Sequence, residues 1–205
     1  YGYRYLGIFA YDESNAFTEN WQQLTPVFDA QGQFMHHTLN GEIYTGVIKQ
    51  KTDAVGSPLL GGDVNFYDAN GDGMTDARDK VKIGCAQPDF YGGISTRLSY
   101  KNFSFYAQVF FSVGGEIYNY AESVRNRFQQ DGYTPSPEAI HNMWTKPGDV
   151  VSYPIPVSVE NNRLAPSDFY IEDASYVKLK NVRISYNIPS KWAKKVWLKS
   201  ASVYV

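Results

Sequence analysis

A strict alternation of apolar and polar residues on both sides of a two-residue turn constrains the fold more than any other feature. In residues 93–100, one face carries Ile94, Thr96, Leu98 and Tyr100. After Lys101 and Asn102, the corresponding face consists of Phe103, Phe105, Ala107, Val109, Phe111 and Val113. A period of two on either side of a two-residue connection predicts a β-hairpin, which we place at residues 93–113.

A third alternating segment lies near the end of the chain. Val182 and Ile184 are in phase on one face, whereas Val177 and Leu179 have the opposite parity. One extra residue in a strand exchanges its two faces, so we expect a β-bulge at residues 180–181.

The segment after this strand completes a second predicted hairpin, residues 176–205. Pro189 ends the alternation, residues 190–195 indicate a short basic turn, and a further strand is expected from Val196 to the end of the chain. The chain begins at Tyr1 without an initiator Met or a recognisable signal peptide. We therefore expect it to be part of a longer polypeptide.

Two long segments, residues 10–80 and 114–175, show little sustained periodicity. Compact soluble domains rarely tolerate structureless connections beyond about 12–15 residues. Short turns at one end of the strands and long loops at the other are typical of an outer-membrane barrel. The alternative is a soluble β-sandwich with one core face and one wet face. Helical spacing in the second segment predicts one short helix through Ile117, Tyr120, Ala121, Val124 and Phe128.

Composition and charge exclude several classes of function. The net charge is −2, so no basic surface for nucleic acid is expected. The single cysteine, Cys85, excludes an intrachain disulfide. His36 and His37 are adjacent and would face opposite sides of a strand, and no catalytic motif accompanies them. We therefore do not expect an enzyme. The aromatic content of 16% agrees with turn-rich β structure.

Residues 68–79 have the ligand order of an EF-hand-type calcium loop. Oxygen donors at positions 1, 3, 5, 7, 9 and 12 would be the side chains of Asp68, Asn70, Asp72, Asp76 and Asp79 and the backbone carbonyl of Met74. Gly73 occupies the position of the sharp turn, but position 12 is Asp79 and not Glu, and no amphipathic helices flank the loop. A structural Ca²⁺ and a metal-free loop of Asx turns both remain open.

Several motifs in the same order resemble the SusC/RagA family of TonB-linked outer-membrane proteins of the Bacteroidetes. Besides the acidic loop, they are Gly62-Asp63-Val64, Ile83-Gly84, Pro88-Asp89-Phe90-Tyr91-Gly92-Gly93, Gly115-Glu116-Ile117-Tyr118-Asn119, Trp144-Thr145-Lys146-Pro147-Gly148-Asp149 and residues 169–189. The resemblance covers nearly the whole chain and is weakest at residues 10–61.

The resemblance implies an all-β fold that is part of a large antiparallel transmembrane barrel of about 22 strands with a plugged lumen. Residues 1–205 would supply a C-terminal portion in the outer membrane, in contact with its lipid, with 10–92 and 114–175 as extracellular loop regions. The plug and the segment that contacts the TonB complex would lie upstream. Such proteins import oligosaccharides or peptides together with a SusD-like surface lipoprotein.

In that setting, four aromatic residues are candidates for contact with the substrate or the lipoprotein: Tyr118, Tyr120, Trp144 and Tyr153. Their large amphipathic side chains are of the kind enriched at interfaces, and packing of the loops onto each other is the alternative for each. Two other functions remain open from the residues alone. They are a soluble calcium-stabilised β domain that binds carbohydrate, and a secreted hydrolase.

Overall fold

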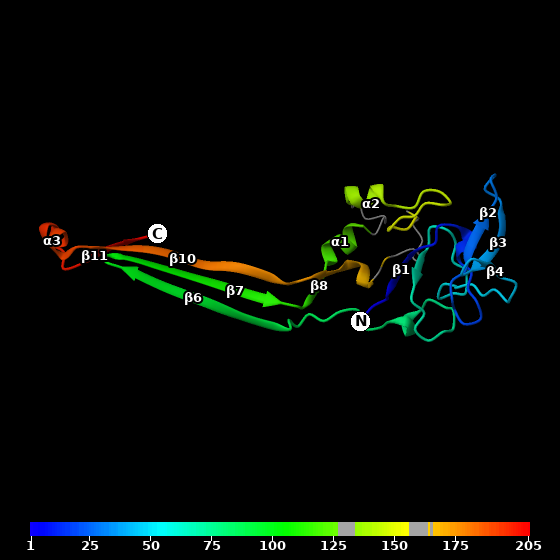
Figure 1. The fold of residues 1–205 in the computed structure, drawn as a ribbon, viewed down its shortest axis with the longest axis horizontal. Helices are drawn as coiled ribbons and strands as arrows, with labels where there is room; N and C mark the ends of the chain where they lie inside the picture. The colour runs from blue at the N-terminus through cyan, green and yellow to red at the C-terminus, as the bar shows by residue number, and fades with distance from the viewer. Residues whose placement is uncertain (127–133, 156–163, 165) are drawn as a thin grey trace. The chain divides into compact units, whose positions relative to one another are not determined.

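The computed structural model is mainly β, and it describes residues 1–126, 134–155, 164 and 166–205 (Figure 1). The chain divides into two compact units. We call residues Tyr1–Gly84 and Tyr118–Ile171 the loop unit, and residues Cys85–Ile117 and Glu172–Val205 the strand unit. The described strands form four sheets, and none of these sheets is closed into a barrel.

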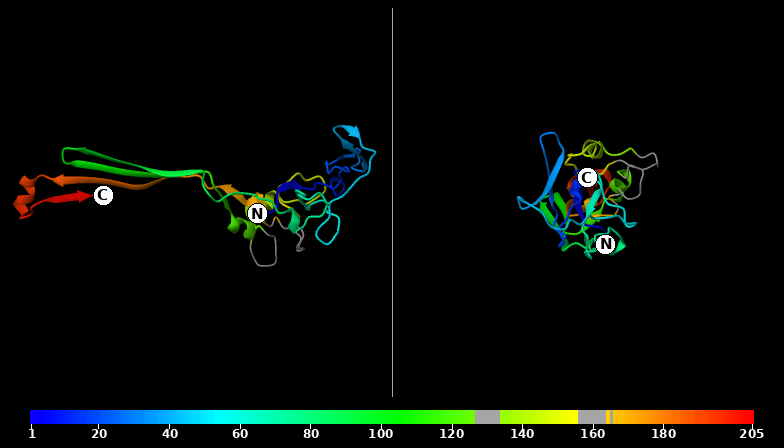
Figure 2. Two further views of the ribbon diagram at one scale, coloured as in Figure 1. Left: turned by 90° about the horizontal axis from the view of Figure 1, so that it is seen from below. Right: turned by 90° about the vertical axis from the view of Figure 1, so that its right-hand side faces the viewer.

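The strand unit is a four-stranded antiparallel sheet. Its strands are β6 (Phe90–Tyr100), β7 (Phe103–Val113), β10 (Tyr176–Ile188) and β11 (Ala201–Tyr204), in the order β11-β10-β7-β6. Figure 2 shows β11, in red, alongside β10 in its left-hand view. Both predicted hairpin pairings are therefore present. The first strand begins three residues earlier than expected because Phe90 already pairs with Val113.

The strand expected from Val196 begins instead at Ala201. Between β10 and β11 the chain forms α3 (Ser190–Ala193) and the 3₁₀ turn η5 (Lys194–Val196), which ends at Trp197 in the left-handed conformation. The apolar residues near Trp197 thus belong to the connection and not to the strand.

The register of the sheet confirms the predicted bulge. Leu179 of β10 pairs with Val109 of β7, and Asn181 pairs with the next residue, Gln108. Lys180 is thus the extra residue, and it lets the apolar residues on both sides of the bulge share one face of the sheet.

The loop unit contains two small sheets. One pairs β1 (Tyr5–Ile8) with β5 (Val64–Phe66), and the other has the order β2 (Thr25–Phe28), β3 (Phe34–Leu39), β4 (Glu42–Ile43). The second sheet lies where the sequence showed no sustained periodicity. Pro26 in β2 and a register shift between Val27 and Phe28 explain why the alternation was not recognisable.

Short helical elements complete the described chain. They are η1 (Asp12–Ser14), η2 (Ala77–Asp79), α1 (Tyr120–Arg125), α2 (Pro137–His141) and η4 (Asp168–Tyr170). The remaining strands β8 (Glu116–Tyr118) and β9 (Ile171–Asp173) pair with each other. The predicted short helix corresponds to α1, which Asn119 caps by accepting the N–H of Glu122. Ile117 lies in β8, and Phe128 falls outside the described residues.

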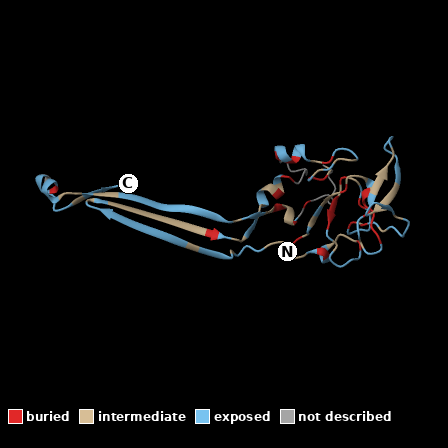
Figure 3. Cartoon of the chain, in the orientation of Figure 1, coloured by how far each residue is buried: buried red, intermediate tan, exposed pale blue. Residues whose placement is uncertain are grey.

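Burial differs between the two units (Figure 3). The loop unit has two apolar clusters of buried residues, one around Val64, Phe66 and Tyr170 and one around Phe9 and Phe17. In the strand unit most large apolar side chains are exposed, Leu98, Leu179 and Ile184 among them. Among the described helices, none has the length and apolar character to cross a membrane.

Candidate functional site

The four-stranded sheet has one apolar and one polar face. Cross-strand pairs on the apolar face are Ile94 with Val109, Leu98 with Phe105, Phe105 with Ile184, Val109 with Leu179, and Phe111 with Val177. Pairs on the other face include Ser95 with Gln108 and Arg97 with Tyr106. Side chains alternate between faces along a strand, so this register places the predicted apolar set together.

Aromatic residues bound the apolar face at both ends. At the turn between β6 and β7, Phe103 packs on Tyr186 with ring centroids 4.7 Å apart. At the other end, Phe90 and Phe111 are 6.1 Å apart. A cavity of about 260 Å³ lies beside the turn and is lined by Leu98, Ser99, Tyr100, Phe103, Ser104, Phe105 and Ile184. An apolar band between two aromatic girdles is the surface that strands present to lipid.

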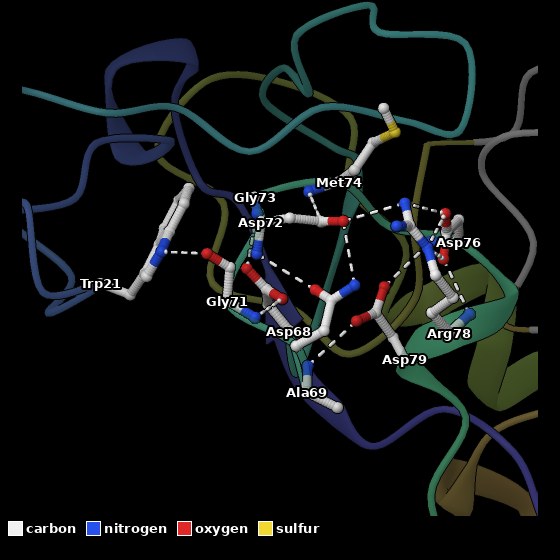
Figure 4. Close-up of polar contacts among 11 residues, drawn as sticks. Trp21, Asp68, Ala69, Gly71, Asp72, Gly73, Met74, Asp76, Arg78 and Asp79 are labelled. Carbon is white, nitrogen blue, oxygen red and sulfur yellow. Dashed lines mark hydrogen bonds and ion pairs between the residues drawn. The ribbon is translucent and has the colours of Figure 1, made fainter.

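The acidic loop of residues 68–79 is held by its own carboxylates (Figure 4). The Asp68 carboxylate accepts the N–H groups of Gly71 and Gly73, each at 2.7 Å. The Asn70 side-chain oxygen accepts the N–H of Asp72, whose carboxylate in turn accepts the N–H of Met74. Successive Asx turns therefore fix the first half of the loop.

Asp79 closes the loop from inside the loop unit. Its side chain is fully buried and accepts the N–H of Ala69 at 3.0 Å and the N–H of Asp76 at 2.9 Å. Asp76 in turn caps η2 by accepting the N–H of Arg78 at 2.7 Å. The two ends of the loop are thus joined through one buried carboxylate.

Arg78 supplies a positive charge on the outer side of the loop. Its guanidinium lies 2.9 Å from the Asp72 carboxylate and 2.8 Å from that of Asp76 (Figure 4). The hydrogen bonds from Arg78 hold the pKa of Asp76 below its ordinary value of 3.8. Arg78 occupies position 11 of the loop, where the spacing of calcium ligands gave no reason to single it out.

Lys51 supplies a second positive charge, buried in the loop unit. Its side chain is 4% exposed, and its Nζ donates to Asn65 Oδ1 at 2.8 Å and to the carbonyl of Phe66 at 2.5 Å. Burial lowers the pKa of Lys51 to about 8, although the carboxylates of Asp68 and Asp79 act in the opposite direction.

Trp21, which is distant in the sequence, contacts the acidic loop. Its indole N–H donates to the carbonyl of Gly71 at 2.9 Å, and Lys49 Nζ lies 5.2 Å from the centre of its ring. Gly73 has φ +79°, and a Cβ there would collide with the indole. Trp21 was missed by sequence reasoning because it lies 50 positions away from Gly71 and belongs to no periodic segment.

The structure brings the six predicted calcium-ligating residues into one loop, where the oxygens described above accept hydrogen bonds. Among the described residues, no group of three or more Asp, Glu, His or Cys side chains is placed to hold a metal ion. Ca²⁺ binding by this loop and the metal-free loop of Asx turns both stay predictions.

The four predicted contact aromatics differ in exposure. Trp144 and Tyr153 are 8% and 5% exposed. The Trp144 indole donates to the carbonyl of Ala10, and Tyr153 packs edge-on against Phe169. Tyr118 is half-buried and donates to Ser123. Tyr120 alone of the four is exposed, at 65%. Packing therefore accounts for Trp144 and Tyr153, and surface contact remains a prediction best suited to Tyr120.

Comparison with known proteins identifies relatives of one kind. TonB-dependent receptor P39 of Formosa agariphila is 41% identical over 189 residues, which are 91% of this chain and 18% of the receptor. TonB-dependent receptor SusC of Bacteroides thetaiotaomicron is 26% identical over 153 residues, 71% of this chain and 14% of SusC. The chain therefore spans less than a fifth of the length of these relatives. No protein-family model matches the sequence.

A solved structure has the same fold over nearly the entire chain. The RagAB peptide transporter aligns with 99% of this chain and 18% of its own, with a TM-score of 0.52 and 20% sequence identity. At this identity the likeness concerns the fold alone. It aligns the described sheets with part of a much longer chain.

Proposed function

Because the chain belongs to the SusC/RagA-type family of TonB-dependent receptors, we propose that it forms part of the outer-membrane barrel of a nutrient importer. The family consists of transporters and not of enzymes, which argues against the secreted hydrolase. The observation that carries the proposal is the apolar face shared by β6, β7 and β10, bounded by aromatic residues at both ends. In a barrel this face contacts lipid, and the polar face lines the lumen.

The proposal extends to cargo and partners. The importer takes up oligosaccharides or peptides, as a likeness both to SusC and to the RagAB peptide transporter suggests. Its partners are a SusD-like lipoprotein at the cell surface and the TonB complex, the latter through a region outside this chain. The segments 10–92 and 114–175 lie on the extracellular side, where the exposed Tyr120 is available to the lipoprotein or the substrate. We also propose that residues 68–79 bind a structural Ca²⁺.

A pair of neighbouring substitutions in β7 tests the membrane assignment. Val109 lies on the apolar face opposite Ile94 and Leu179, whereas Gln108 points to the polar face opposite Ser95 and Asn181. In the full-length receptor, Val109→Arg should reduce assembly because a charge facing lipid costs about 2–4 kcal/mol at the bilayer midplane. Gln108→Arg should be tolerated. Assembly is measured as the heat-modifiable band in outer-membrane fractions.

The two variants differ by one position in the same strand and introduce the same side chain, so each is the control for the other. Equal assembly of both, or a greater loss for Gln108→Arg, would refute the assignment of the apolar face to lipid.

A further inference from the structure

The connection between β10 and β11 concentrates lysine and tryptophan. Residues 190–199 contain no acidic residue, and their charged and aromatic side chains are Lys191, Trp192, Lys194, Lys195, Trp197 and Lys199. All six side chains are exposed. Trp197 is 97% exposed and has a left-handed backbone with φ +62°. The indole of Trp197 is therefore not packed against the described residues of the chain.

The strand unit has a cluster of lysines at one end of the sheet and its acidic residues at the other, with Arg97, Lys178, Lys180 and Arg183 along the strands between them. The turn between β6 and β7 lies at the same end as α3, because Tyr186 pairs with Phe103 and the N–H of Asn187 donates to the carbonyl of Asn102. That end carries five lysines: Lys101, Lys191, Lys194, Lys195 and Lys199. The acidic residues of the strand unit, which are Asp89, Glu116, Glu172 and Asp173, are at the opposite end.

The basic end continues directly into the apolar face. The cavity of about 260 Å³ that Leu98, Phe105 and Ile184 help to line lies beside the same turn. Tryptophan prefers the boundary between lipid tails and water, where its ring is buried and its N–H remains hydrated. Lysines next to such a boundary attract anionic lipid headgroups. The surface thus combines both features of a headgroup-level anchor.

We propose that residues 190–199, together with Lys101, bind the anionic phospholipid headgroups of the membrane leaflet at the turn end of the sheet. This inference rests on the proposed outer-membrane location and adds a lipid preference to it. The four acidic residues at the other end would repel the same headgroups. The sheet therefore carries a charge signal for its orientation across the bilayer as well as an apolar band.

The test uses the full-length receptor reconstituted in nanodiscs that contain phosphatidylcholine and phosphatidylglycerol. Mass spectrometry of the lipid retained after gentle extraction measures the enrichment of phosphatidylglycerol. Lys194→Gln/Lys195→Gln should reduce this enrichment about thirtyfold, whereas Lys194→Arg/Lys195→Arg should keep it. The matched control is Lys82→Gln/Lys146→Gln, which removes two exposed lysines of the loop unit and should change nothing.

The outcomes separate this inference from the proposed function. If the receptor inserts normally but the Gln pair and the control pair retain equal amounts of phosphatidylglycerol, the anchor is refuted. Displacement of the lipid by inorganic phosphate would also refute it, because the site would then bind free phosphate and not a membrane surface. If the unmodified receptor does not insert into bilayers, it is the proposed barrel function that fails.

Discussion

The ammonium group of Lys51 is buried in the loop unit, where it donates to neutral oxygens of Asn65 and Phe66. Its folded-state pKa is about 8 instead of 10.5. Between these two values the unfolded chain binds more protons than the folded one, so stability rises with pH in this window. We expect a gain of up to about 3 kcal/mol. Hydrogen exchange of β5 amides in the full-length receptor, corrected for intrinsic rates, measures this change.

Substitution of Lys51 provides the control for that pH dependence. Lys51→Met should abolish the rise between pH 8 and pH 10.5 because the titrating group is gone. It should also lower protection at neutral pH, since Asn65 Oδ1 and the Phe66 carbonyl lose their donor inside the unit. A pH dependence that survives in Lys51→Met would assign it to another group.

Calcium binding at residues 68–79 is a second prediction at the scale of residues. Four carboxylates meet in this loop, and Arg78 already pairs with those of Asp72 and Asp76. If Ca²⁺ binds, Arg78→Gln should raise its affinity because the competing guanidinium is removed. Removal of calcium by a chelator should speed proteolysis within residues 63–83, and Asp68→Ala should have the same effect without a chelator.

The metal-free alternative gives a different pattern. In that case the chelator has no effect, but Asp79→Ala still destabilises the loop by about 2–4 kcal/mol, because the N–H groups of Ala69 and Asp76 lose the buried carboxylate that accepts them. A crystal structure grown in millimolar calcium decides the matter. The absence of density ringed by these oxygens at about 2.3–2.6 Å would contradict the calcium prediction.

The sequence predicted the acidic residues of this loop but not the groups that hold it. The spacing of Asp68 to Asp79 is a local pattern and could be read directly. Lys51 contacts Asn65 and Phe66, and Trp21 contacts Gly71, through tertiary hydrogen bonds, and neither lies in a periodic segment. Contacts between residues so far apart in the sequence leave no local signal, so only the structure could identify them.

At the scale of elements, the bulge in β10 predicts that deletion of Lys180 and deletion of Leu179 have different effects. Leu179 and Asn181 pair with adjacent residues of β7, so removal of Lys180 would join them into a regular strand with the register kept on both sides. The full-length receptor should therefore assemble without Lys180. The expected loss is limited to the contact of its Nζ with the Phe110 ring, at 5.3 Å from the centroid.

Deletion of the preceding residue is the matched control. Without Leu179, Lys180 would take the position opposite Val109 and place an ammonium group on the apolar face. Assembly should fall as it does for other charges that face lipid. Similar assembly of the two deletion variants would mean that the bulge does not set the faces of this strand.

Long strands were recognisable from the sequence, whereas short ones were not. β6, β7 and β10 each have 11 or more residues, which is enough for alternation to appear above chance. β2 to β4 have six residues or fewer, and Pro26 interrupts the pattern. The start of β11 was placed too early because Trp197 and Leu198, which belong to the preceding turn, are themselves apolar.

At the scale of the whole molecule, the four-stranded sheet is incomplete as a membrane structure. Its order leaves β6 and β11 at the two edges, and the chain covers only 18% of the RagAB transporter chain it matches. In lipid, each unpaired backbone group at such an edge costs several kcal/mol. In water, the apolar face of β6, β7 and β10 has no cover from the described residues. We therefore expect the isolated four-stranded sheet to be unstable both in lipid and in water.

The 205 residues expressed alone should therefore aggregate or be degraded, while the same residues fold within the full-length receptor. The comparison is made by size-exclusion chromatography in detergent and by resistance to a protease, with the full-length receptor as the control. The strand unit should be cleaved first in the isolated chain, because its edge strands β6 and β11 each have one side without a pairing strand among the described residues. A monodisperse monomer that melts cooperatively in water would instead support a soluble β domain, and it would show that the apolar face packs within the chain and does not require lipid.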